Sequence, residues 1–273
     1  GEDAADPIVR ATLLPGLGVM RELGPWLSAF AGAHRGFSPV APGQPAEVEP
    51  ELSWNYELGG RLSQGDLHAE LVGFGNDYRN ITGTCTLSGG CVGEQLDQQF
   101  NGGAVWVYGV EAVAGQTLLL PGDFSLPLAA TYTWTESRFR TGFASAFPQF
   151  GTVEVGDSLP YSPQHQGSAQ LTVQHPRFRV GVSGTARGGM LDEAGVWPIT
   201  ASDVPGLFLL DAAGDVQLTE RLQGYVTGTN LTNRDALTSW RPVGARPTPP
   251  LQVMVGLRVG PAERAERAER VER

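Results

Sequence analysis

The chain has 273 residues, a hydrophobic fraction of 41% and a formal net charge of −10. This charge argues against a nucleic-acid-binding protein, which needs a basic face to neutralise phosphates, and the hydrophobic fraction argues against global disorder. No apolar run approaches the ~20 residues of a membrane helix, and the sequence shows neither a start Met nor a signal-peptide pattern.

Apolar and polar side chains alternate along much of the chain, which is the side-chain period of a β-strand. In residues 51–61 polar positions separate the apolar ones, which are Leu52, Trp54, Tyr56 and Leu58. The alternation recurs often enough to predict eleven strands. They lie near residues 9–20, 24–34, 50–62, 66–78, 100–113, 125–138, 159–174, 177–186, 206–213, 215–229 and 248–259.

The lengths of the strands and of their connections favour a membrane barrel over a soluble sandwich. Soluble strands have about five or six residues, whereas a tilted membrane strand needs about nine to eleven, and many of the predicted strands reach that length. Short connections, such as 63–66, 174–177 and a turn around Gly214–Asp215, alternate with long ones at 35–49, 79–99, 139–158, 187–205 and 230–247.

An antiparallel meander places every second connection at the same rim, so the long loops gather at one end. Long extracellular loops and short periplasmic turns are typical of outer-membrane barrels. The link at 114–124 is longer than a tight turn and departs from this order.

Aromatic residues occur in pairs two positions apart on the apolar faces, namely Trp54 with Tyr56, Trp106 with Tyr108, and Tyr132 with Trp134. In a barrel such pairs form part of an interfacial girdle. Ordinary core aromatics would produce the same spacing, so both interpretations stand at this point.

The two cysteines, Cys85 and Cys91, lie in a segment rich in Gly, Ser and Thr, a loop composition. Two cysteines this close in a loop favour a short disulfide, and therefore an oxidising compartment. The alternatives are two free thiols or half of a metal site, but a metal site needs more ligands than the neighbouring sequence offers.

Catalytic motifs are missing: the sequence contains no nucleophile elbow, no zinc-protease motif and no phosphate-binding loop. The four histidines, His34, His68, His165 and His175, are scattered. We therefore expect neither an enzyme nor a resident metal.

Several segments follow one another in a recognisable order. They are HRGFSP (34–39), PELSWNYELGGR (50–61), FNGGAVWVYGVEAV (100–113), YTWTESRF (132–139), LPYSPQHQGSAQL (159–171), TNLTNRD (229–235) and SWRPVGARPTPP (239–250). The order and sequence of these segments resemble the C-terminal half of a TonB-dependent outer-membrane receptor. The last of them is similar to the final loop of ferric-citrate-type receptors.

This resemblance implies an all-β fold, an antiparallel up-and-down transmembrane β-barrel. Residues 1–259 would supply about 11 strands, half of a 22-stranded barrel, with the plug domain absent. Residues 260–273 would be a charged low-complexity tail. An odd strand number places the two ends on opposite sides of the membrane, so we expect a fragment or a truncated chain. The tail, and the lack of a final aromatic residue, depart from the family pattern.

The function that the resemblance implies is uptake of a ferric chelate, ferric citrate or a siderophore, at the outer membrane of a Gram-negative bacterium. The TonB complex would supply energy through the missing plug. Iron would travel only as part of the chelate, so no cofactor is expected. The other expected partners are outer-membrane lipid and lipopolysaccharide, and no nucleic acid.

An anionic chelate suits guanidinium groups, which donate paired hydrogen bonds to carboxylates. The candidate ligand-binding residues lie in or beside the expected long loops: Arg35, Arg138, Arg140, Arg187, Arg241 and Arg246. Each could instead be a surface arginine that pairs with a nearby acid or with lipopolysaccharide phosphates. The charged residues expected to face the lumen or the plug are Glu57, Arg61, Glu111 and Arg258.

A different class of function is a secreted all-β sandwich or solenoid that recognises a glycan or a protein through its long loops. A single strand with one apolar and one polar face is equally compatible with this reading. A β-rich hydrolase is the third reading, and the missing motifs weigh against it.

Overall fold

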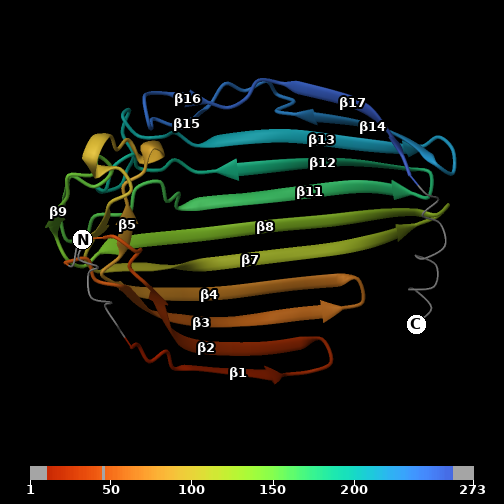
Figure 1. The fold of residues 1–273 in the computed structure, drawn as a ribbon. Coiled ribbons are helices and arrows are strands. Elements are labelled where there is room, and N and C mark those ends of the chain that lie inside the picture. Colours follow the sequence, from red (N-terminus) through yellow and green to blue (C-terminus); the bar gives the residue numbers. More distant parts are fainter. Residues whose placement is uncertain (1–10, 45–46, 261–273) are drawn as a thin grey trace, which may run out of the picture.

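The computed structural model describes residues 11–44 and 47–260. Eleven long strands form one antiparallel sheet in which spatial neighbours follow the chain order. Figure 1 shows the strands side by side, from β1 in red to β17 in blue. They are β1 (Gly16–Glu22), β2 (Leu27–Ser38), β3 (Glu51–Gln64), β4 (Leu67–Arg79), β7 (Val105–Leu120), β8 (Phe124–Phe139), β11 (His165–His175), β12 (Phe178–Arg187), β13 (Leu207–Gln217), β14 (Leu222–Thr229) and β17 (Gln252–Val259).

The smaller elements all belong to the long connections and lie at one end of the sheet (Figure 1). Three two-stranded ribbons pair β5 (Thr82–Thr84) with β6 (Gln99–Asn101), β9 (Phe143–Ala144) with β10 (Thr152–Val153), and β15 (Leu237–Ser239) with β16 (Arg246–Pro247). The short 3-10 helices are η1 (Leu87–Gly89) and η2 (Gly93–Gln95). None of the helices in the described residues is long and apolar enough to span a membrane.

The predicted all-β architecture is confirmed, and each of the eleven expected strands corresponds to one strand of the main sheet. The long connections are 39–50, 80–104, 140–164, 188–206 and 230–251, and all lie at the same end because the strands are antiparallel. Tight turns join the strands at the opposite end. The expected sorting of long and short connections is therefore present. The expected tail at 260–273, Gly260 apart, lies outside the described residues.

The long link expected at 114–124 is wrong, and its correction restores the alternation of loop lengths. Strand β7 continues to Leu120 and β8 begins at Phe124, so the turn has only three residues. Residues 117–120 continue the register with the start of β8, from Thr117 opposite Pro127 to Leu120 opposite Phe124. Positive φ angles at Gly122 and Asp123 reverse the chain within this short turn.

The turn expected around Gly214–Asp215 is also wrong, because both residues lie inside β13. Asp215 is an acceptable strand residue there because its carboxylate accepts hydrogen bonds from both neighbouring strands. The Arg179 guanidinium donates to it at 2.8 and 3.0 Å, and the Gln223 amide donates at 2.9 Å. The reversal occurs instead at 218–221.

The register sorts the side chains of the sheet into two faces. On the apolar face, Tyr56 lies opposite Ala33 and Gly75, and Leu58 lies opposite Ala31 and Gly73. Large apolar side chains on this face are strongly exposed, with Leu58 at 68% and Val255 at 76%. Leaving many large apolar side chains in water is unfavourable, whereas contact with lipid is not.

The opposite face is polar, and residues of the long loops fold over its upper part. Val105 and Phe139 on the ends of β7 and β8 are fully buried there, against Val153 of the loop 140–164. Among the described residues, β1 and β17 each pair along one side only, so the sheet is open. In lipid, the free backbone groups of both edges need further strands as partners.

Candidate functional site at the long-loop end

An aromatic cluster joins the loops 80–104 and 140–164. Phe100 contacts Phe147 and Phe150 edge to face, with ring centroids 4.2 and 5.1 Å apart, and Phe143 lies next to Phe100 and Phe139. Edge-to-face contacts of this kind add about 0.5–1.5 kcal/mol each beyond the burial of area. The two loops therefore form one packed unit over the polar face.

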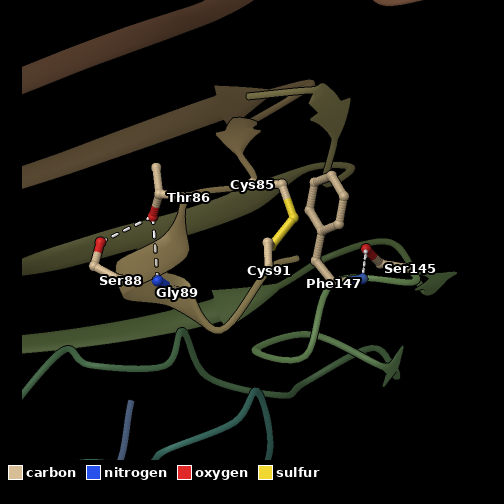
Figure 2. Close-up of a disulfide and its surroundings, with 7 residues drawn as sticks. All are labelled: Cys85, Thr86, Ser88, Gly89, Cys91, Ser145 and Phe147. Atoms are coloured by element: carbon tan, nitrogen blue, oxygen red, sulfur yellow. Dashed lines mark hydrogen bonds between the residues drawn. A yellow bond between two sulfur atoms is a disulfide. The ribbon is translucent and has the colours of Figure 1, made fainter. Parts of the chain in front are cut away.

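A disulfide closes the tip of the first loop (Figure 2). Cys85 and Cys91 are bonded to each other, with Cα atoms 5.6 Å apart, and both are almost fully buried against Phe147. Thr86 caps η1 by accepting a hydrogen bond from the Gly89 amide at 3.2 Å. The sequence left three alternatives open for this pair, namely a disulfide, two free thiols or half of a metal site. The structure has the disulfide.

Replacing both Cys85 and Cys91 with Ser should cost the loop about 2 kcal/mol, the value expected for closing so short a ring. We expect faster proteolysis of residues 80–104 in the complete gene product, with unchanged heat-modifiable mobility of the barrel. Ser88→Ala, a change to an exposed hydroxyl in the same loop, is the matched control. Equal cleavage rates for the double variant and the control would contradict a stabilising disulfide.

A polar cluster around Arg241 joins three further segments of the loops. The guanidinium Nη2 donates to the Asp192 carboxylate at 2.9 Å, to Glu193 at 3.1 Å and to the Pro148 carbonyl at 3.1 Å. The Arg241 side chain is only 11% exposed and that of Asp192 only 15%. A buried charge pair with several hydrogen bonds holds its loops firmly in place, because removing either partner leaves the other charge buried without a counter-charge.

Tyr161 and Asp203 extend this polar cluster. The Tyr161 hydroxyl donates to the Asp192 carboxylate and accepts hydrogen bonds from Ser239 and from the Trp240 amide. Burial, together with the bond to Asp192, raises the pKa of Tyr161 above its usual value. The Trp240 indole donates to the Asp203 carbonyl at 3.2 Å.

The Asp203 carboxylate accepts from the amides of Asp192 and Thr200 and from the Thr200 hydroxyl. Burial alone would raise the pKa of Asp203, but these hydrogen bonds lower it overall. The Asp203 carboxyl is therefore ionised at neutral pH. We call the hydrogen-bonded group formed by Tyr161, Asp192, Asp203, Trp240 and Arg241 the loop clamp. It holds the loops 140–164, 188–206 and 230–251 in one arrangement.

The six candidate ligand-binding arginines do not converge. Arg35 lies inside β2 rather than in a loop, opposite Trp54, because β2 runs on to Ser38. Arg138 lies inside β8 opposite Trp106, and Arg140 follows directly after that strand. These three stand on the apolar face of the sheet, away from the loop clusters.

The other three candidates occupy the loop end. Arg241 belongs to the loop clamp. Arg187 ends β12 and donates to the Met190 sulfur at 2.8 Å and to the Pro205 carbonyl at 3.4 Å, so it braces the loop 188–206. Arg246 is exposed in β16. Of these three, Arg246 is therefore the exposed one, and its role in binding stays a prediction.

The residues predicted to face the lumen or the plug share one face of the sheet. By register, Glu57, Arg61 and Glu111 all lie on the polar face, as does Arg258 opposite Gln223. Arg61 forms an ion pair with Glu70 at 2.6 Å. Their contact with a plug stays a prediction.

The polar face also carries residues that the sequence reasoning did not single out. A hollow across β11–β14 is lined by Gln170, Thr172, Arg179, Ser183, Asp211 and Asp215. All six occupy the polar positions of alternating strands, so the period-two pattern contained the signal.

An open antiparallel sheet with one lipid-compatible face, one polar face and long loops at one end defines a section of an outer-membrane β-barrel. Residues 4–231 match a family model described as TonB dependent receptor-like, beta-barrel. This chain belongs to that family, whose members are transport receptors of the outer membrane rather than enzymes.

Solved receptors share the fold. The ferric citrate transporter FecA in its unliganded form is 20% identical with a TM-score of 0.68, and the match covers 90% of this chain and 38% of FecA. The ferric-catecholate import receptor Fiu from E. coli K12 is 17% identical with a TM-score of 0.67, covering 89% of this chain and 34% of Fiu.

FpvA from P. aeruginosa, in complex with an iron-bound pyoverdine, is 19% identical with a TM-score of 0.67, covering 90% of this chain and 32% of FpvA. At these identities the likeness shows the fold alone. The chain spans about a third of the length of these receptors. A search of curated protein sequences finds no match.

Proposed function

We propose that the chain forms part of the wall of an outer-membrane receptor that takes up a ferric chelate with energy from the TonB complex. The family match supports this proposal, and so do the similar solved structures, which include a ferric citrate transporter and a ferric-catecholate import receptor. The observation that carries it is the packing of the long loops into two clusters above the polar face.

Such an arrangement suits capture of a ligand from outside. The aromatic cluster and the loop clamp hold the loops in fixed positions, which reduces the entropy lost when a ligand binds. Below the loops, the polar face offers side chains that suit water, a plug or a passing solute. The alternative, a secreted binding domain, does not account for the exposed apolar face.

Uptake of labelled iron tests the proposal. We expect that deleting the gene lowers uptake of at least one ⁵⁵Fe complex, supplied as ferric citrate or as a ferric siderophore, in iron-starved cells. Restoring the gene should restore uptake, and deleting the TonB gene should abolish it again. Uptake of every tested complex at the parental rate in the deletion strain would contradict the proposal.

A further inference from the structure

A tight turn at residues 147–150, which we call the linking turn, belongs to both loop clusters. The amides of Phe150 and Gly151 donate to the Phe147 carbonyl at 2.9 and 3.2 Å, and these bonds close the turn. The Phe147 amide also donates to the Ser145 hydroxyl at 3.1 Å, as Figure 2 shows. The conformation of the linking turn is therefore fixed by its own hydrogen bonds.

The two phenylalanines of the linking turn attach it to the loop 80–104. Phe147 packs edge to face on Phe100, with ring centroids 4.2 Å apart, and it also packs against the buried disulfide. Phe150 contacts the same Phe100 ring from a second direction, with centroids 5.1 Å apart. The aromatic cluster therefore holds both ends of the turn.

The backbone between these phenylalanines is bonded to the two later loops. The Pro148 carbonyl accepts a hydrogen bond from Arg241 Nη2 at 3.1 Å, and the Gln149 carbonyl accepts one from the Ala194 amide at 2.9 Å. Arg241 belongs to the loop clamp, and Ala194 lies in the loop 188–206. The side chains of one short turn thus serve the aromatic cluster, while its carbonyls serve the loop clamp and its neighbour.

A second contact joins the disulfide loop to the loop clamp directly. A Cβ atom placed on Gly90 would lie 3.3 Å from Arg241 Nη1 and 3.8 Å from a ring carbon of Pro148. Gly90 has a φ of 91°, a conformation that favours glycine, where it ends η1. The backbone beside the disulfide therefore lies against the guanidinium group with no side chain between them.

Opening either cluster disturbs the same turn. If the loop 80–104 moved away, the buried Phe147 ring would be exposed to water, which is unfavourable. If Arg241 moved away, the Asp192 carboxylate would keep a buried charge without its counter-charge. A displacement of the turn that breaks one set of contacts also breaks the other, and segments that share contacts in this way open together.

We infer that four loops, 80–104, 140–164, 188–206 and 230–251, form one cooperative unit that opens and closes as a whole, with the linking turn as its coupling element. A molecule that binds one of these loops would then change the stability of all four, because coupling between sites is reciprocal. The inference concerns the loops themselves and is independent of the ferric chelate proposed above.

Hydrogen exchange followed by mass spectrometry, on the complete gene product in detergent and without a ligand, tests the coupling in both directions. Phe147→Ala removes a ring of the aromatic cluster, and we expect the slowest amides of 80–104 and of 230–251 to exchange at least fivefold faster by the same factor. Arg241→Leu removes a member of the loop clamp and should likewise accelerate both segments by one common factor.

Phe147→Leu serves if Phe147→Ala fails to fold, and it should accelerate both segments about twofold. The matched control is Leu87→Ala, which shortens an exposed side chain of the same first loop and should leave both segments at the parental rate. Acceleration confined to the loops that the substituted residue touches would overturn the inference, as would unchanged exchange in both segments. Equal acceleration of β3 and β4 would also overturn it, because the loops would then open only with the barrel.

Discussion

Leu58→Arg is expected to destabilise the folded barrel by roughly 2–4 kcal/mol, the cost of a lipid-facing arginine at the membrane midplane. Leu58 lies at the middle of the 14-residue strand β3 and is 68% exposed on the apolar face. The adjacent residue Glu57 occupies the same depth on the polar face, opposite Gly32 and Phe74. Glu57→Arg should therefore cost less than about 1 kcal/mol, since it stays in a polar environment.

The measurement is equilibrium unfolding by guanidinium chloride of the complete gene product in lipid vesicles. The two variants introduce the same side chain one residue apart, so a difference between them reports the face and not the strand. Leu58→Met controls for loss of the leucine shape, and we expect it to behave like the parent. A larger cost for Glu57→Arg than for Leu58→Arg would show that the two faces are assigned the wrong way round.

The alternation of side chains was sufficient to predict the strands, because a residue's face follows from parity once a strand is recognised. The prediction failed where the local composition concealed the alternation of apolar and polar positions. The three consecutive leucines 118–120, followed by Pro121, look like the start of a link, yet they continue β7 in register with β8. Asp215 looks like a turn residue, and only its partners on β12 and β14 explain its place inside a strand.

The arginines show which side-chain positions the alternation of the two faces predicts and which it does not. Trp134, Glu136 and Arg138 are two positions apart, so the alternation puts Arg138 on the apolar face, although we expected it to bind a ligand from a position in or beside a long loop. Arg35 was assigned to a loop because the expected strand ended at residue 34, four residues before the real end of β2. The contacts of Arg241 with Pro148 and Asp192 join residues far apart in the sequence, and no local pattern in one sequence specifies them.

Arg241→Leu is expected to release the loop clamp and to cost the loop end about 3 kcal/mol, near the lower limit for removing one partner of a buried ion pair. The Asp192 carboxylate would then keep the Tyr161 hydroxyl as a donor but lose its counter-charge. Because Glu193 is largely exposed, its lost contact should add little. The hydrogen-bond partners of this guanidinium all lie in the long loops, so the barrel should stay folded.

Hydrogen exchange followed by mass spectrometry measures this effect segment by segment. Residues 188–206 and 230–251 should exchange at least tenfold faster in Arg241→Leu, while β3 and β4 should exchange as in the parent. Arg246→Leu removes an exposed guanidinium from the same loop and is the matched control. Adding Asp192→Leu to Arg241→Leu should recover part of the protection, because the stranded carboxylate is then removed as well. Unchanged exchange in Arg241→Leu would mean that the loop clamp contributes no measurable stability to these two loops.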